Sequence, residues 1–261
     1  MTQLRKVPLW SPLGTVSNCP TCGMAVRIMR RESGEADHYE PIYDGYEISQ
    51  VLPEQDPETA EKLRELRKGK KTVAIVGMAP SSCSLAPWHD TDVEIWGVNE
   101  AHAFPWFKKA TRWFQIHHSS SWKRRVAKRR VRGHYKWLKK NPWKIPVYLQ
   151  YPNDEVPLSQ GYPLHQICDR FFKNFTRGDA KVKYFTSTFA YMMGVALLDG
   201  FERIEVYGFE MADEIEYLQQ KACAEFWIGV ALGMGVEVYT PQGNQLLYSK
   251  LYAGMEQGAG W

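Results

Sequence analysis

The strongest constraint on the fold is a regular alternation of short apolar segments and helix-length segments between residues 72 and 239. The first apolar segment, 72–76, reads TVAIV, and similar segments recur at 93–98 and 203–207. Strands that alternate with helices pair in parallel. The sequence therefore predicts an α/β fold with a Rossmann-like, mainly parallel sheet flanked by helices. Further strands are expected at 112–116, 145–149, 183–185 and 236–239, and helices at 121–140, 164–175 and 215–234. Another, apolar helix is expected to follow residues 186–188 and to end at 198.

The segments before this alternation suggest three parts of the chain. Residues 1–52 are interpreted as an irregular N-terminal arm or a small module around a CxxC motif. Residues 53–71 form a linking helix, because acids lie early and bases late in PEQDPETAEKLRELRKGK, which suits the helix dipole. Residues 72–261 form the Rossmann-like nucleotide-binding domain.

Cysteine content and hydropathy indicate the compartment. The five cysteines are an odd number scattered along the chain, which fits a reducing compartment better than a disulfide framework. The N-terminus lacks the apolar core of a signal peptide, and no apolar run approaches the roughly 18 residues of a membrane span. We expect a cytoplasmic protein that does not enter the membrane.

The residues directly after each predicted strand are polar, although the strands are apolar. Ligands of open parallel sheets bind beyond the carboxyl ends of the strands, so these residues are the candidate site. A serine can cap the helix after the first strand, and the amides of a helix start attract phosphate. An ordinary turn and simple helix capping are the alternatives, since GxGxxG and a Walker lysine are absent. The candidates are Gly77, Ala79, Pro80, Ser81, Ser82, Asn99, Thr186, Ser187 and Thr188.

Three stretches, "VAIVGMAPSS", "IWGVNEAH" and "YFTSTFAYMMGVALLDGFERIEVYGFEM", together resemble the family 42 bacterial sialyltransferases. They are also similar to the archaeal 6-hydroxymethylpterin diphosphokinase-like family, and "WFQIH" resembles bacteriophage proteins of unknown role. The resemblance covers roughly residues 72–240. It implies that Gly77, Ala79, Pro80 and Ser81 lie against the phosphates of a nucleotide. It further implies that Asn99 binds base or ribose and that residues 186–188 line the same pocket.

The sequence departs from the sialyltransferases at two positions that bear on catalysis. Thr188 stands where their motif has glycine, and the histidine that they use as a base is missing. A carboxylate can serve as a general base instead, and His117, which follows a predicted strand, is a further candidate. A purely structural role for His117 is the alternative. The carboxylates in the corresponding segment are Glu210, Asp213, Glu214 and Glu216.

Positive charge is concentrated between residues 121 and 144, which hold 11 basic residues and no acid. Phosphate backbone is a natural partner of such a segment, so we expect binding to DNA, with nearby aromatic rings stacked on bases. A solvated helix, or one that attracts an anionic donor, is the alternative. The predicted nucleic-acid-binding residues are Lys123, Arg124, Arg125, Lys128, Arg129, Arg130 and Arg132.

Cys19 and Cys22 have the spacing of half a zinc site. A complete site needs two more ligands, and His38 is the one histidine nearby in the sequence. The module is therefore a candidate zinc-binding site.

Together these features favour a nucleotide-dependent transferase. The favoured reaction is glycosyl transfer from a nucleotide sugar, with a modified base in phage DNA as the acceptor. Two alternatives stay open. One is an ATP-dependent diphosphotransferase, which needs Mg²⁺, and the other is a protein that binds or sequesters a nucleotide without turnover.

Overall fold

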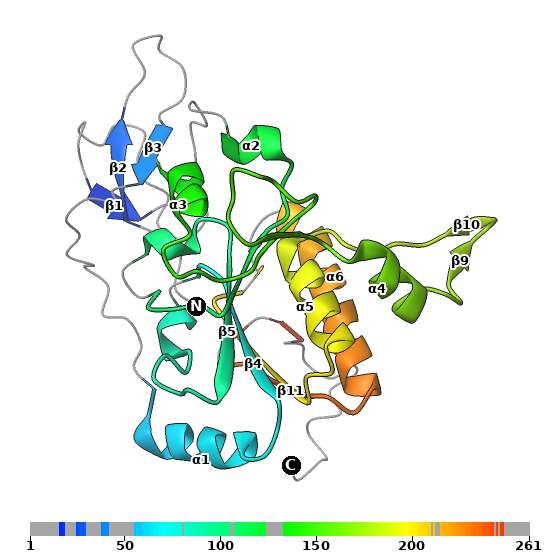
Figure 1. Cartoon of the computed structure of the whole chain (residues 1–261). Coiled ribbons are helices and arrows are strands. Elements are labelled where there is room, and N and C mark those ends of the chain that lie inside the picture. Colours follow the sequence, from blue (N-terminus) through cyan, green and yellow to red (C-terminus); the bar gives the residue numbers. More distant parts are fainter. Residues whose placement is uncertain are drawn as a thin grey trace.

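The structure is a computed structural model. It describes residues 16–18, 25–29, 38–41, 55–79, 81–104, 107–123, 133–209, 211, 215–242, 244 and 246–247. These residues form a seven-stranded sheet, a three-stranded sheet and a two-stranded sheet (Figure 1).

The seven-stranded sheet is the centre of the fold, and every neighbouring pair of its strands runs parallel. This confirms the predicted α/β class. In spatial order the strands are β12 (Glu237–Tyr239), β11 (Arg203–Tyr207), β4 (Thr72–Val76), β5 (Val93–Val98), β6 (Arg112–Gln115), β7 (Val147–Leu149) and β8 (Ser159–Gly161).

The order of the strands reverses direction at β4. From β4 the chain builds β5, β6, β7 and β8 on one side, and then returns to place β11 and β12 on the other side of β4. A ligand crevice in an open parallel sheet forms at such a reversal, outside the carboxyl ends of the strands. The topology therefore predicts a ligand site beside the turns that follow β4 and β11.

Helices cover both faces of this sheet (Figure 1). α5 and α6 lie side by side on one face, and η1, η2 and α3 pack on the other. The described helices are α1 (Pro57–Arg67), η1 (Cys83–Leu85), η2 (Ala101–Ala103), α2 (Ser119–Lys123), α3 (His134–Lys140), α4 (Leu164–Phe171), α5 (Thr188–Leu198) and α6 (Ile215–Gly233).

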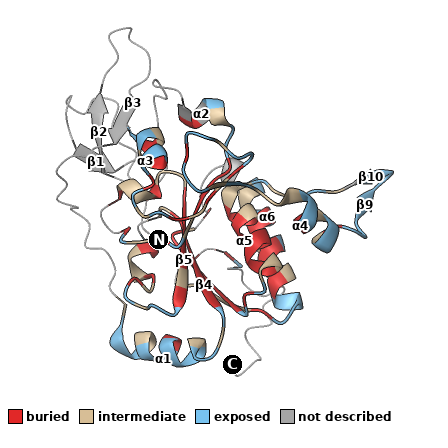
Figure 2. Ribbon diagram, viewed as in Figure 1, coloured by how far each residue is buried: buried red, intermediate tan, exposed pale blue. Residues whose placement is uncertain are grey.

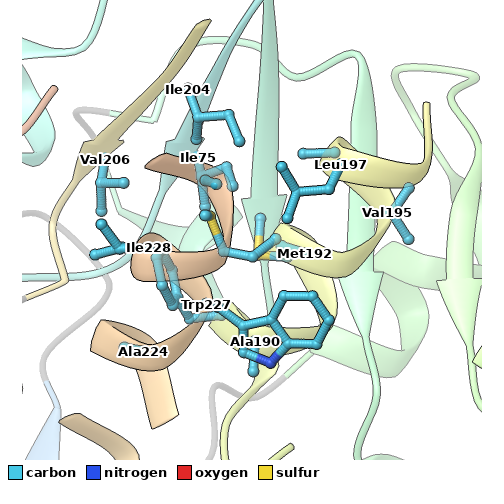
Figure 3. Close-up of a cluster of buried hydrophobic side chains, with 14 of the residues drawn as sticks. Ile75, Ala190, Met192, Val195, Leu197, Ile204, Val206, Ala224, Trp227 and Ile228 are labelled. Atoms are coloured by element: carbon cyan, nitrogen blue, oxygen red, sulfur yellow. The ribbon is translucent and has the colours of Figure 1, made fainter. Parts of the chain in front are cut away.

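The strands divide the interior into two apolar cores, because successive strand residues point to opposite faces. Val73 and Ile75 of β4 contribute to the core beneath α5 and α6, whereas Ala74 and Val76 contribute to the other core. β4 and β11 are buried along their whole length, as are most residues of α5 (Figure 2). Figure 3 shows Ile75, Ile204 and Val206 from the strands beside Met192 of α5 and Trp227 of α6.

A buried ionic cluster ties α1 to the sheet. Glu205, in the middle of β11, has a fully buried side chain. Its two carboxylate oxygens accept hydrogen bonds from Arg67 of α1 at 3.0 and 2.7 Å, from Arg203 at 2.8 Å and from the hydroxyl of Tyr207 at 2.8 Å. Burial and the neighbouring carboxylate raise the pKa of Tyr207 well above its ordinary value, so the phenol remains a donor. The last residue of α1 is thereby fixed against β11.

The structure corrects several predicted elements. No strand forms at 183–185, because that segment packs on α6, where Trp227 and Cys223 both donate to the carbonyl of Tyr184. The predicted helix over 121–140 is not continuous, since Gly133 has a left-handed φ of 100° and α3 begins immediately after it.

Two further stretches contain strands that the sequence did not reveal. The segment between β7 and α4, where no strand is predicted from the sequence, includes β8 at the edge of the sheet. Residues 1–52, predicted to be an irregular arm or a small CxxC module, include an antiparallel sheet of β1 (Val16–Asn18), β2 (Ala25–Met29) and β3 (His38–Pro41). The division of the chain into an arm, a linking helix and a nucleotide-binding domain stays a prediction. Among the helices in the described part of the chain, none is long and apolar enough to cross a membrane.

Candidate nucleotide site

The backbone turns after β4 and β11 lie in direct contact at the carboxyl edge of the sheet. The amide of Gly77 donates to the carbonyl of Tyr207 at 2.8 Å, and the amide of Ala79 donates to the carbonyl of Gly208 at 3.0 Å. A Cβ atom at Gly77 would lie 2.3 Å from the carbonyl oxygen of Gly208. Glycine at position 77 is therefore required by the approach of the second turn, whatever else the turn binds.

Ser82 contributes to the same contact between the two turns. Its hydroxyl oxygen accepts a hydrogen bond from the amide of Gly208 at 2.8 Å, and the side chain does not cap η1, which is a single 3-10 turn. The expected helix with a serine cap after the first strand is therefore wrong, because the turn at Gly208 uses that hydroxyl. Ser81 is exposed, and Pro80 lies outside the described residues.

We expect Gly77→Ala to lower the free energy of unfolding by about 1–3 kcal/mol or more, because the added methyl group overlaps backbone atoms that cannot move aside. Urea denaturation measures the change. Gly229→Ala is the matched control. Nothing lies within 4 Å of a Cβ at that helical position, so it should gain about 0.5–1 kcal/mol. Equal effects of the two substitutions would contradict the close approach of Gly208 to Gly77.

Asn99 follows β5 and has a left-handed backbone with φ of 49°. Two bonds hold its main chain: its amide donates to the carbonyl of Phe114 at 2.9 Å, and the indole of Trp113 donates to its carbonyl at 3.1 Å. Its Oδ1 atom is buried without a hydrogen-bond partner. A buried acceptor without a partner costs about 1–3 kcal/mol, so this atom is suited to a ligand that supplies a donor.

The start of α5 lies at the same edge. Phe189, the second residue of α5, packs on Phe209 of the turn after β11, with ring centroids 4.9 Å apart. Ser187 occupies the N-cap position, but its hydroxyl makes no capping bond and is buried without a partner. The first turn carries no acid that would neutralise the helix dipole. Thr186 is exposed and donates to the carbonyl of Gln219 in α6 at 3.1 Å.

These groups are close enough together for one nucleotide. The turns of β11, β4, β5 and β6 succeed one another along the sheet edge. Neighbouring strands are about 4.8 Å apart, so the turn at Gly77 lies about 10 Å from the one at His117. The structure thus gathers the predicted residues Gly77, Ala79, Asn99, Ser187 and Thr188 at one edge.

His117 follows β6 and ends a chain of hydrogen-bonded side chains. The Gln115 amide contacts Nδ1 of His117 at 3.2 Å and Nε2 of His134 at 2.8 Å, and Nδ1 of His134 contacts Nε2 of His102 at 2.8 Å. Gln115 is 0% and His134 is 3% exposed, whereas His117 is exposed. Burial lowers the pKa of His102 to about 4, so this imidazole is neutral at neutral pH.

Sequence reasoning missed Gln115, His134 and His102. They come from the end of β6, the start of α3 and η2, and no local pattern connects them.

The aromatic rings near the basic segment pack on the core beside η2 and α3. Trp137 stacks on His102 with ring centroids 4.0 Å apart, and Trp143 stacks on Phe107 at 5.9 Å. Trp122 is buried, and its indole donates to the carbonyl of His117. These rings pack against protein, Trp137 and Trp143 being half-buried, and the stacking of nucleic-acid bases on them stays a prediction.

Several predicted residues lie outside the described part of the chain. For Lys123 and Glu216 only the backbone is described, within α2 and α6. Within the described residues, no group of three or more His, Cys, Asp or Glu side chains is arranged to hold a metal ion. The predicted residues that are not described are Cys19, Cys22, Arg124, Arg125, Lys128, Arg129, Arg130, Arg132, Glu210, Asp213 and Glu214.

A hollow opens at the amino edge of the sheet, which is the edge opposite the candidate site. It has a volume of about 290 Å³ and is lined by Lys70, Phe201, Glu202, Gly235 and Glu237, among others. Charged residues of this lining pair with one another, as Lys70 does with Glu237. This hollow provides a comparison site for ligand-binding experiments.

The sequence matches no protein-family profile, and no curated protein sequence matches it. Among solved structures, the sialyltransferase CstII from Campylobacter jejuni in complex with the substrate analogue CMP-3FNeuAc is similar at 11% identity and a TM-score of 0.40. The alignment covers 68% of this chain and 83% of that one. The sialyltransferase CST-II in complex with a trisaccharide acceptor and CMP is similar at 14% identity and a TM-score of 0.41, with the same coverage. Similarity at this level carries no functional conclusion, which must come from the residues of this chain.

Proposed function

We propose that the protein is a nucleotide-dependent transferase whose donor is a nucleotide sugar, bound at the carboxyl edge of the parallel sheet. The observation that carries the proposal is the pair of buried polar atoms without partners, Oδ1 of Asn99 and Oγ of Ser187, at the reversal of the strand order. The resemblance of the surrounding motifs to the family 42 sialyltransferases favours glycosyl transfer over other nucleotide chemistry.

Each part of the site is assigned one part of the donor. The N-terminus of α5 carries partial positive charge and faces the phosphate, to which Ser187 and Thr188 add hydroxyl donors. Asn99 binds the base or ribose, and the contact between the turns at Gly77 and Gly208 forms the floor of the nucleotide site.

With the donor bound in this way, the protein would transfer the sugar to an acceptor hydroxyl. A base removes the proton of an acceptor hydroxyl, and the oxygen attacks the anomeric carbon. The bond from that carbon to the nucleotide phosphate breaks, and the phosphate leaves with the electron pair. The candidates for the base are His117 and the carboxylates between residues 210 and 216. The basic residues from 123 to 132 favour DNA as the acceptor.

A thermal-shift screen against CMP, UDP, GDP and ATP, their available sugar conjugates, and Mg²⁺ tests the proposal. A ligand at 100 times its dissociation constant adds about 2.7 kcal/mol of stability. We expect a nucleotide sugar to raise the melting temperature and to be consumed on incubation with an acceptor. A shift with ATP that requires Mg²⁺ would favour diphosphoryl transfer instead. A shift without turnover would favour a sequestering protein, and no shift with any compound would contradict the proposal.

Ser187→Ala separates ligand binding from helix capping. A normal N-cap contributes about 0.5–2 kcal/mol of stability, but the hydroxyl of Ser187 makes no capping bond. We therefore expect almost unchanged stability and a 3- to 10-fold weaker donor affinity, roughly the contribution of one neutral hydrogen bond. Urea denaturation and calorimetric titration measure the two effects.

Asp56→Ala is the control for Ser187→Ala, because Asp56 does cap α1 by accepting from the amide of Thr59 at 2.8 Å. It should lower stability and leave donor affinity unchanged. A Ser187→Ala protein that loses stability but keeps its affinity would assign Ser187 to capping alone.

A further inference from the structure

A hairpin projects from the body of the protein beyond α4. We call residues 164–183 the arm, which comprises α4 and the two antiparallel strands β9 (Thr176–Arg177) and β10 (Ala180–Lys181). In Figure 1 the hairpin lies beyond α4 and away from the sheet, and Figure 2 shows its exposure to solvent. No residue of the arm belongs to the nucleotide site described above.

The arm is anchored in the core at its base. Ile167 of α4 is fully buried, and Phe172 packs on Phe185 and Trp227 with ring centroids 5.7 and 5.6 Å apart. Beyond this anchor, every residue from 173 to 180 is exposed. A two-stranded hairpin without an apolar face adds little stability of its own. Packing therefore does not explain why the chain builds this hairpin.

Positive charge is concentrated on the arm. It holds five basic and two acidic residues, a net charge of +3, whereas the whole chain has +4. The lysines Lys62 and Lys68 of α1 each pair with an acid of their own helix. By contrast, none of the exposed cations of the arm forms a salt bridge within the described part of the chain. A protruding group of cations without carboxylate partners attracts a polyanion. These exposed cations are Arg170, Lys173, Arg177 and Lys183.

The pairing of the two strands orients the side chains of the hairpin. Arg177 pairs with Ala180, and the amide of Val182 donates to the carbonyl of Phe175 at 3.2 Å. Alternate residues of an extended strand point to the same face, so Phe175 and Arg177 share one face of the ribbon. Phe175 is 51% exposed. This face therefore presents an aromatic ring and a guanidinium together to solvent.

The dimensions of the hairpin match the major groove of duplex DNA. The ribbon extends three residues from Phe175 to the turn at Gly178, which is about 10 Å. The major groove is about 8.5 Å deep and admits a two-stranded β-ribbon. Arg177, beside the turn, then reaches base edges, where a guanidinium pairs with guanine. Lys173 and Lys183, nearer the base of the arm, face the phosphates.

We infer that the arm binds duplex DNA, with the β9–β10 hairpin in the major groove. An anionic membrane surface would also attract these cations, but peripheral membrane binding depends on apolar area that enters the lipid. Phe175 is the one large apolar side chain that is exposed among the described residues of the arm. The arm is also separate from the basic residues 123 to 132, so it adds a second element to the predicted contact with DNA.

The use of this DNA as the acceptor rests on the proposed function. Lys183 precedes Ser187 by four residues, so the two lie at most about 14 Å apart along the chain. Ser187 begins α5, where the proposed donor phosphate binds. A duplex held by the arm therefore lies beside the donor, and the arm serves to bring the acceptor to it.

The salt dependence of DNA binding tests the inference. Lys173→Gln together with Arg177→Gln removes two exposed cations on either side of Phe175. Fluorescence anisotropy of a labelled duplex measures the affinity of the full chain at several salt concentrations. We expect binding to weaken by about 10- to 100-fold at 0.1 M salt, and the slope of log affinity against log salt to fall by about 2.

Lys62→Gln together with Lys68→Gln is the matched control, because it makes the same change of charge on α1. Both lysine side chains are 76% exposed. This variant should keep the slope of the wild type, and circular dichroism checks that both variants are folded. Equal losses in the two variants would overturn the inference, since net charge alone would then explain the binding. A wild-type chain that binds phosphatidylserine vesicles or single strands but no duplex would also overturn it.

The binding experiment is independent of the proposed function, because it contains no nucleotide sugar. Arm-dependent binding of duplex DNA by a protein that consumes no donor would support the inference and contradict the transferase. Sugar transfer by a protein whose arm variant binds DNA like the wild type would leave the transferase standing and overturn the inference. An arm variant that loses donor affinity but keeps its affinity for DNA would likewise overturn it and make the arm a cover of the donor site.

Discussion

Asn99→Gly is expected to weaken nucleotide binding by about 10- to 100-fold and to leave the protein at least as stable as the wild type. The loss corresponds to about 1.5–3 kcal/mol, appropriate for one or two hydrogen bonds to a ligand from a preorganised side chain. The free energy of unfolding does not fall, because glycine adopts the left-handed conformation without strain. The substitution also removes a buried oxygen that has no hydrogen-bond partner. Calorimetric titration and urea denaturation measure the two quantities on the same preparation.

Asn141→Gly is the matched control for Asn99→Gly. Asn141 also has a left-handed backbone, with φ of 37°, but its amide is fully used. It donates to the carbonyls of Ile145 and Pro157 and accepts from the amide of Ile145. We expect this variant to lose at least about 1–3 kcal/mol of stability and to keep its nucleotide affinity. If Asn99→Gly behaved like Asn141→Gly, Asn99 would be a structural residue and not part of the site.

Glu205→Gln is expected to lower the free energy of unfolding by about 3–5 kcal/mol, the cost of breaking a buried ion pair by neutralising one partner. The substitution keeps the size of the side chain but leaves Arg67 and Arg203 without their shared carboxylate. Arg67 retains Asp90 at 3.3 Å and Arg203 retains Glu237 at 2.8 Å, which lessens the loss without removing it. Urea denaturation followed by circular dichroism provides the measurement.

Glu65→Gln on α1 is the control for this experiment. Glu65 pairs with Lys68 at 3.5 Å, and both side chains are largely exposed. Exposed pairs contribute from zero to about 1 kcal/mol. A loss from Glu205→Gln no larger than that from Glu65→Gln would show that the buried cluster does not hold α1 to the sheet.

Most of the sheet was predictable because its central strands are buried on both faces and therefore read as continuous apolar runs, such as TVAIV in β4. The polar residues that follow the strands were predictable for a related reason, since parallel strands bring their carboxyl ends to one edge. Short edge elements were not predictable in this way. β8 reads SQG and has no apolar pattern, because an edge strand is partly exposed and its pairing is made by the backbone.

The finer geometry of the site depends on contacts between distant segments. Gly77 was expected to make room for phosphate, whereas the structure shows that its missing side chain admits the carbonyl of Gly208, far along the sequence. Ser82 looked like a helix cap, but Gly208 engages its hydroxyl. The contact of Gln115 with His134 likewise becomes visible only when α3 is placed beside β6.

The central claim is that a nucleotide binds at the carboxyl edge of the sheet, and backbone amide NMR tests it most directly. The protein is titrated with the nucleotide that raises its melting temperature most, and ¹H–¹⁵N shifts are followed residue by residue. We predict the largest changes at Met78, Asn99, Ser187 and Thr188, and none at Gly200 and Gly235 in the hollow at the amino edge. Changes confined to that hollow, or a saturating nucleotide that leaves the carboxyl edge unperturbed, would contradict the account.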